Sequence, residues 1–441
     1  MSEARPDIVV PQEAAERGLI ISGELRSETA RIPSMLAQFS KIDPGSREAE
    51  IYFYPTVDQA RKLFAAPPPF SFEGEVTARD GVEEQWKAAG IWTKPGSQIT
   101  YKEAMYWTAS SGSIENLHIN TTSQDRSSKD FHSSAWFVMN RCFLLQVLAN
   151  PEKEDLEAAK QHGFPERTFS LALLDGATAE IRRRIQSHKL GVAREEKKTG
   201  YSLCVRDFND EERVKSDVEA LLILASFASR ERTMLSHWST ERVAGNHHRH
   251  WLFNIPKFPK RQERIEPLVP RDHAQCAKFL TGAFRVYCGA KHRELFDAAV
   301  YAQLSHDLPL EVEIVRLFSG IQSALVFALQ EPKTAKRPQI RALYEKFMKK
   351  YSPDFSDLWP LLSKLSGASL SDIRNAVVHG EVFVESDWTA LSYAGQNLRW
   401  MLERILLISL GWDVHTSDVS PQRLRLFYAH QWHTEQKKIQ A

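Results

Sequence analysis

The sequence predicts an α+β protein with a β-rich, sandwich-like front half and an all-α helical bundle behind it. Before residue 175, apolar and polar residues alternate along several short segments, which is the period of half-buried strands. After about residue 271, apolar residues recur every three or four positions, as on amphipathic helices. We therefore divide the chain into a β-rich domain over residues 1–175, a mixed connecting region over 176–264 and a helical domain over 265–441.

The clearest predicted strand covers residues 70–77, where the alternation is almost unbroken. Residues 117–122 repeat the pattern, and residues 51–54 form an aromatic run that Pro55 ends. Further strands are predicted at residues 18–25, 135–147 and 168–174, with a short helix over residues 151–166.

In the connecting region, Ser216 and Glu219 have the spacing of a capping box, which predicts that a buried helix begins there and runs to about Phe227. Strands are predicted at residues 233–236 and 250–255. The basic, proline-punctuated residues 256–270 are interpreted as the linker into the helical domain.

Seven further helices are predicted from apolar stripes, prolines and glycines. One of them is the short helix that follows Ser369. The others cover residues 273–287, 292–304, 309–330, 336–351 and 355–365, and a long helix is expected from near Ser386 to Gly411. Stripes of this kind are typical of a bundle of four or five helices.

Composition places the chain among ordinary soluble proteins. It has 441 residues, 42% of them hydrophobic and 26% charged, and its net charge is +1, so any binding site for a polyanion must come from a local patch. The four cysteines are widely spaced, which favours a reducing compartment over a disulfide framework or a cysteine zinc site. No apolar run is long enough to span a bilayer, so we expect a cytoplasmic protein without a membrane partner.

The most informative feature is the group Arg374, Asn375 and His379 within residues 369–381. Asn375 and His379 are four residues apart and so share one helical face, and the long Arg374 side chain can reach the same side. The interval from Arg to His is not distinctive, because it recurs at Arg183/His188, Arg232/His237, Arg242/His247 and Arg425/His430.

Context separates this group from the other four. Ser369 is a good N-cap with Asp372 three residues later, and Gly380 follows His379 as a C-cap glycine would. The alternative interpretation is structural, since Arg and His near a helix C-terminus often cap carbonyls or pair with acids such as Asp372 and Glu381.

These three residue types suit cleavage of a phosphodiester. An imidazole titrates near neutral pH, so it can take a proton from a ribose 2′-hydroxyl or give one to the leaving 5′-oxygen. A guanidinium can bridge two phosphate oxygens and stabilise the charge that develops on them. The side chain of Asn375 can orient the imidazole or hold a phosphate oxygen.

The group resembles the signature of HEPN domains, whose ribonuclease members carry Arg, a polar residue, a short spacer and His. The resemblance is strongest over residues 290–412, and the whole layout is similar to ApeA-type anti-phage HEPN proteins. It implies a metal-independent, cofactor-free endoribonuclease with Arg374, Asn375 and His379 as catalytic residues. It also implies a homodimer in which two such helices form one cleft, and a role in abortive infection.

The same resemblance suggests partners and a further residue. RNA is the expected substrate, with tRNA as one candidate, and a phage-derived trigger is expected to act through the β-rich region. Glu313 is a candidate acidic member of the site, although a first-turn helix acid has an ordinary structural explanation. The alternative function is a non-catalytic HEPN dimer that binds RNA, a nucleotide or a protein partner.

Three basic clusters are candidates for contacts with RNA phosphates. The one we favour lies in residues 333–350 and includes Lys336, Arg337 and Arg341; the others cover residues 182–198 and 257–264. For any single cluster, a solvated surface face is the simpler explanation and the one that the sequence favours. The histidines at 237, 247, 248 and 250 lack the spacing of a zinc site, so we expect exposed imidazoles there.

Overall fold

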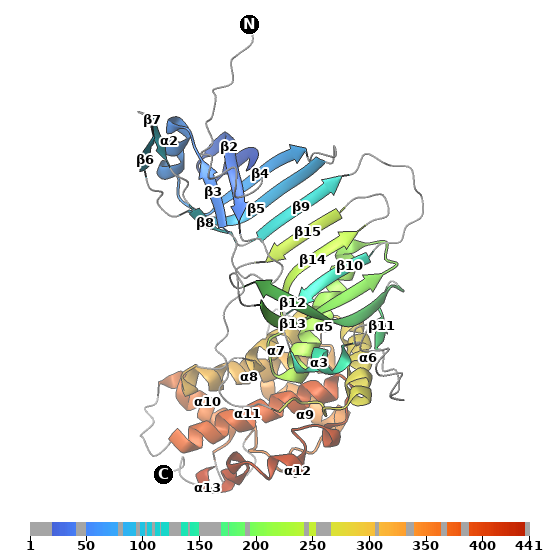
Figure 1. Cartoon of the computed structure of the whole chain (residues 1–441). Coiled ribbons are helices and arrows are strands. Elements are labelled where there is room, and N and C mark those ends of the chain that lie inside the picture. The colour runs from blue at the N-terminus through green and yellow to red at the C-terminus, as the bar shows by residue number, and fades with distance from the viewer. Residues whose placement is uncertain are drawn as a thin grey trace. The chain divides into compact units, whose positions relative to one another are not determined.

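The predicted α+β class is confirmed by the computed structural model, in which an antiparallel curled sheet precedes a set of helices (Figure 1). The structure describes residues 20–40, 50–77, 83–93, 98–101, 104–107, 111–114, 116–122, 134–139, 142–149, 169–174, 176–189, 195–241, 247–252, 266–304, 308–331, 339–362, 368–380 and 388–436.

The chain divides into two compact units. The first, here called the β unit, comprises Met1–Asn140, Asn150–Lys215 and Met234–Lys260. The second, the helical unit, comprises Arg141–Ala149, Ser216–Thr233 and Arg261–Ala441. The mixed region that we predicted over residues 176–264 is thus shared between the two units.

Thirteen described strands form one sheet in the β unit, in the order β11-β12-β13-β10-β14-β15-β9-β5-β4-β1-β2-β3-β8. β5 also pairs with β8, so six strands close into a small ring at one end (Figure 1). The strand bounds are β1 Ile20–Arg26, β2 Arg31–Ser40, β3 Glu50–Tyr54, β4 Phe70–Thr77, β5 Glu83–Thr93, β8 Ser111–Ser113, β9 Asn116–Thr122, β10 Ser134–Met139, β11 Ser170–Ala172, β12 Thr178–Lys189, β13 Glu195–Arg206, β14 Leu235–Glu241 and β15 His247–Leu252. A separate hairpin pairs β6 (Gln98–Tyr101) with β7 (Ala104–Trp107).

An aromatic core fills the closed ring. Phe72 lies 5.9 Å from Phe39 and 6.2 Å from Phe53 between ring centroids, and Phe39 lies 5.0 Å from Trp86. Helix α2 (Val57–Ala65), which Thr56 caps, adds the buried Leu63. The inward face of each strand is therefore apolar, which accounts for the alternation in the sequence.

One predicted strand is only partly correct. Residues 135–147 were expected to be continuous, but the strand ends at Met139 and helix α3 (Phe143–Leu148) follows. Leu144, Leu145 and Leu148 are buried on one side of α3, and a short apolar run of this kind does not distinguish a strand from a helix. The helix predicted over residues 151–166 lies outside the described residues.

Helix α5 (Glu211–Ser229) begins earlier than predicted. Its start is stabilised by Asp210, whose side chain accepts a hydrogen bond from the backbone N–H of Arg213 at 3.2 Å. Ser216 therefore lies inside the helix, and the expected capping box at Ser216 and Glu219 is wrong. Asp is as favourable as Ser at the N-cap position of a helix. The acidic side chains of Glu211 and Glu212 also interact favourably with the positive end of the helix dipole in the first turn.

The helical unit contains most of the predicted helices. They are α6 His273–Gly289, α7 Arg293–Gln303, α8 Leu310–Leu329, α9 Ile340–Tyr351, α10 Leu370–His379 and α11 Trp388–Ser409. The C-terminal segment adds η2 Val414–Thr416, α12 Pro421–Leu424, η3 Tyr428–Gln431 and α13 Trp432–Gln436. By length and composition α8 alone among the described helices could cross a membrane, but it packs against α7 and α11 and half of its apolar stretch is buried, as in the core of a soluble unit.

The helix predicted over residues 355–365 is wrong where the structure describes it. Residues 355–362 instead form one short turn at residues 356–357 followed by bends and irregular backbone, and Pro360 has no N–H to continue a helix. The backbone N–H of Trp359 donates to the side chain of Asn397 at 3.0 Å, and its indole donates to Ala368 O at 2.8 Å. Hydrogen bonds to distant residues have replaced the local helix.

A buried polar network on α11 holds the helical unit together. Glu403 is fully buried and accepts hydrogen bonds from Arg230 Nη2 at 2.6 Å, from Arg230 Nε at 2.8 Å and from Gln303 Nε2 at 2.9 Å. Arg404, also fully buried, binds both carboxylate oxygens of Asp357 at 2.6 Å. These contacts tie α5, α7 and the segment after α9 to α11.

Candidate functional site

The motif helix α10 is defined at both ends by the predicted residues. Ser369 Oγ accepts from the backbone N–H of Asp372 at 3.3 Å, and the Asp372 side chain accepts from the backbone N–H of Ser369 at 2.8 Å. Gly380 ends the helix with φ of 75°, a left-handed conformation that glycine adopts without steric cost. The capping box and the C-cap glycine are therefore confirmed.

The first turn of α10 is also tied to the extended segment before it. The N–H of Leu370 donates to Pro360 O and the N–H of Ser371 donates to Leu361 O, both at 3.0 Å. Leu370 and Ile373 are buried beneath the helix. Because its early N–H groups already have partners and two side chains anchor it, α10 presents the opposite face in a fixed orientation.

Arg374 is held by two neighbours. Its guanidinium carbon lies 5.7 Å above the ring of Phe318 on α8, and its Nη1 donates to Asn375 Oδ1 at 3.0 Å. The ring contact is a cation–π interaction that positions the charge while leaving other N–H groups of the guanidinium to bind a ligand. Phe318 was not predicted as a supporting residue, because nothing local in the sequence links α8 to α10.

Asn375 and His379 are both exposed, as is the intervening Val378, at 48% of its surface. Among the described residues, no carboxylate pairs with Arg374 or His379. The helix end is closed by the backbone N–H of Gly380, which donates to Ala376 O and Val377 O. Arg374 is therefore half-buried and bound to Asn375, Asn375 and His379 are exposed one helical turn apart, and no described acid neutralises Arg374 or His379.

Glu313 does not contact the motif residues Arg374 and His379 in the described part of the chain. It lies in the first turn of α8 and forms an ion pair with Arg399 of α11, whose guanidinium also donates to the backbone oxygen of Gln303. The contacts of Glu313 in the described part of the chain are therefore to α11, and none of them is to Arg374 or His379.

Of the favoured basic cluster, Arg341 is described and exposed on α9, while Lys336 and Arg337 lie outside the described residues. Residues 257–264 lie outside them as well. In the cluster at residues 182–198, Arg182 pairs with Glu180 at 2.8 Å. Within the described parts of the chain, no group of three or more His, Cys, Asp and Glu residues is placed to hold a metal ion.

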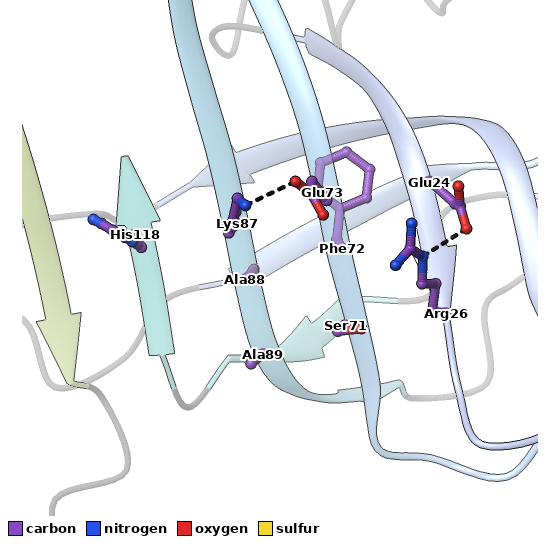
Figure 2. A pocket seen from close by; sticks show the side chains of 9 residues that line it. All are labelled: Glu24, Arg26, Ser71, Phe72, Glu73, Lys87, Ala88, Ala89 and His118. Atoms are coloured by element: carbon purple, nitrogen blue, oxygen red, sulfur yellow. Dashed lines mark hydrogen bonds and ion pairs between the residues drawn. The ribbon is translucent and has the colours of Figure 1, made fainter. Parts of the chain in front are cut away.

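A shallow cavity of about 260 Å³ lies on the outer face of the β unit (Figure 2). Its charged walls are already paired, since Lys87 binds Glu73 at 2.8 Å and Arg26 binds Glu24 at 2.6 Å. The neighbouring guanidiniums of Arg31 and Arg26 lower the pKa of Glu24 to about 2. The cavity is smaller than usual ligand pockets and offers no described charge without a partner, so α10 remains the better candidate site.

Comparisons with known proteins found no relative of this chain. No family model, curated protein or solved structure matches this chain. The function of the site must therefore be argued from its own residues.

Proposed function

We propose that this protein is a metal-independent endoribonuclease of the HEPN type, with α10 at its active site. The observation that carries the proposal is that one rigidly capped helix carries the half-buried Arg374, bound to Asn375, together with the exposed Asn375 and His379. A purely structural Arg and His would be expected to have acidic partners or to cap carbonyls. In the described part of the chain, Arg374 has neither, and the carbonyls at the helix end are bound by Gly380.

The reaction proposed is an internal transesterification. A neutral imidazole of His379 takes the proton from a ribose 2′-hydroxyl, and the 2′-oxygen attacks the adjacent phosphorus. The bond from phosphorus to the 5′-oxygen breaks, and an imidazolium returns a proton to that oxygen. The products are a 2′,3′-cyclic phosphate and a 5′-hydroxyl, and DNA is not cleaved because it lacks the nucleophile.

Arg374 and Asn375 are proposed to handle the phosphate. The guanidinium of Arg374 carries a permanent charge and binds the non-bridging oxygens, which gain negative charge in the transition state. The hydrogen bond from Arg374 to Asn375 fixes the position of both side chains. The Phe318 ring beneath the guanidinium keeps it oriented when no RNA is bound.

A homodimer would supply both the base and the acid. One chain carries one such motif, so a second imidazole in the same cleft must come from a second copy related by two-fold symmetry. The exposed Val378 on α10 and Trp388 at the start of α11, 53% exposed, are apolar residues that such an association would cover.

The cellular role proposed rests on the resemblance to ApeA-type proteins. A cytoplasmic ribonuclease that degrades RNA after infection must be inactive in healthy cells. The β unit is therefore proposed to restrain the helical unit until a phage-derived trigger is recognised, and tRNA is one candidate substrate.

Substitution tests the proposal directly. His379→Ala and Arg374→Ala should each reduce RNA cleavage by about 100-fold or more, because each removes a group used in the transition state. His415→Ala and Arg285→Ala change exposed residues of the same types elsewhere in the helical unit and should leave cleavage unchanged. Cleavage that survives in the His379→Ala and Arg374→Ala proteins would instead favour a HEPN dimer that binds RNA, a nucleotide or a protein without cutting.

A further inference from the structure

Three consecutive large apolar side chains are exposed from the turn after α12 to the first residue of η3. The exposed fractions are 76% for Leu426, 47% for Phe427 and 79% for Tyr428. Single exposed apolar residues are common on protein surfaces, but an adjacent set with two aromatic rings is unusual. We call Arg423, Arg425, Phe427 and Tyr428 the aromatic platform.

The surrounding structure imposes this exposure. Leu424 and Ala429, which flank residues 425–428, are buried at 1% and 8%, and Asn397 of α11 donates to Ala429 O at 2.9 Å. The N–H of Phe427 donates to Leu424 O at 3.0 Å, and the N–H of Leu426 donates to Arg423 O at 3.1 Å. The segment between the two anchors is therefore a fixed turn that points its side chains outward.

One ring of the platform is braced from below. The Phe427 ring lies 5.8 Å from the ring of Trp400 on α11, at an angle of 59°. Trp432, which follows η3, stacks on Trp359 at 5.9 Å and donates from its indole to Asp357 O at 3.2 Å. A ligand that binds the platform therefore meets a surface that is already ordered, which lowers the entropy lost on binding.

The charges of the platform have one sign. Arg423 and Arg425 are both exposed, and neither has an ion-pair partner among the described residues. The acids near them in sequence are committed elsewhere, because Asp418 pairs with Arg230 at 2.7 Å and Glu435 is 7% exposed. The platform thus combines two cations with two accessible aromatic faces.

We propose that the aromatic platform binds single-stranded RNA, with bases stacked on Phe427 and Tyr428 and phosphates held by Arg423 and Arg425. Proteins that hold single strands combine stacking rings with a basic track in this way. A duplex hides the faces of its bases, so the platform selects unpaired segments or loops. This inference rests on the proposed function, and it narrows the substrate of the α10 site to RNA with single-stranded regions.

The test measures RNA binding by the full-length His379→Ala protein, which separates binding from cleavage. The probe is a fluorescein-labelled, unstructured RNA of about 20 nucleotides, long enough to cover a typical single-strand site. Tyr428→Ala in this background should raise the Kd about 5- to 100-fold, whereas Tyr428→Phe, which keeps the ring, should stay within about twofold.

Two further variants sharpen the result. Arg423→Gln with Arg425→Gln should reduce the slope of log K against log salt by about 1.4, because two phosphate contacts to a single strand are lost. Tyr301→Ala is the matched control: Tyr301 is also an exposed tyrosine of the helical unit, at 41%, and the guanidinium of Arg232 lies 5.0 Å from its ring. Its Kd should not change.

An unchanged Kd in the Tyr428→Ala protein, or no binding of the probe by the parent protein, would overturn the platform. A change in sedimentation behaviour with unchanged RNA binding would overturn it too, by showing that the surface joins protein chains. If the wild-type chain cleaves no RNA but Tyr428→Ala still weakens binding, the platform stands and the proposed nuclease activity fails.

Discussion

Replacing Glu403 by Gln tests whether the polar network on α11 is needed to hold the helical unit together. The carboxylate of Glu403 accepts three hydrogen bonds, at 2.6, 2.8 and 2.9 Å. A Gln amide accepts through its oxygen alone, so at least one N–H of Arg230 or Gln303 would face the N–H groups of the new amide.

The expected cost follows from burial. Breaking a buried ion pair by removing one partner costs roughly 3–5 kcal/mol, because the remaining charge stays buried. Arg230 keeps its ion pair with Asp418 at 2.7 Å and its hydrogen bond to Glu266 O at 2.9 Å. We therefore expect Glu403→Gln to lower the free energy of unfolding of the helical unit by about 3 kcal/mol, at the lower end of that range.

The assay is urea unfolding followed by far-ultraviolet circular dichroism, which is dominated by helices. The matched control is Glu266→Gln, the same change in the same unit. The Glu266 side chain pairs with Arg271 at 2.9 Å, but both partners are more than half exposed, so the cost should be below about 0.5 kcal/mol. If the two variants unfold with free energies within about 0.5 kcal/mol of each other, the reasoning about burial is wrong.

Two other features can be tested separately. Phe227 on α5 lies 5.9 Å from Phe296 and 6.4 Å from Phe279, so Phe227→Ala should cost about 4 kcal/mol in urea unfolding, and a fragment that starts at residue 261 should lose this packing and unfold more readily. The four cysteines are buried, and burial raises the pKa of Cys276 to about 12 and of Cys288 to about 11. Burial also raises the pKa of Cys142 and of Cys204, so all four thiols should be protonated at about pH 8. Iodoacetamide at that pH should therefore leave the native protein unmodified and alkylate all four thiols after unfolding; rapid native labelling of any of them would contradict the burial.

Local patterns predicted the elements whose stability is local. Residues 70–77 form the predicted strand because every second side chain faces the core of the ring. The alternation of apolar and polar residues in the sequence reflects this burial directly. The α10 helix was predicted from Ser369, Asp372 and Gly380, because a capping box and a C-cap glycine act within a few residues. The Gly411 end of α11, with φ of 74°, was found for the same reason.

Predictions failed where a distant residue decides the local conformation. Residues 355–362 have an apolar pattern suited to a helix, but Arg404 binds the Asp357 side chain and Asn397 binds the Trp359 backbone. Those partners lie 38 and 47 residues further along the chain, so a pattern read over a short stretch of sequence cannot include them. The division into units has the same cause, because residues 216–233 pack into the helical unit although the strands that flank them belong to the β unit.

The candidate site was only partly accessible from the sequence. Arg374, Asn375 and His379 were found from a motif on one helix, and in the structure Arg374 binds Asn375 while Asn375 and His379 are exposed. Phe318 could not be found, because its contact with Arg374 joins two helices separated by more than 40 residues in sequence. The aromatic platform is visible in the sequence as two arginines beside two aromatic residues. The sequence does not show whether the two rings are buried in the core, and only their exposure in the structure identifies them as a surface.

The most direct test of the proposed chemistry is to determine the ends produced when the purified chain cuts RNA in the presence of a metal chelator. An RNA with one 2′-deoxy nucleotide at a mapped cleavage position serves as the paired substrate. The proposal predicts 2′,3′-cyclic phosphate and 5′-hydroxyl ends, with cleavage lost at the deoxy position and in the His379→Ala protein. Ends that carry a 5′-phosphate, or cleavage at the deoxy position, would contradict it.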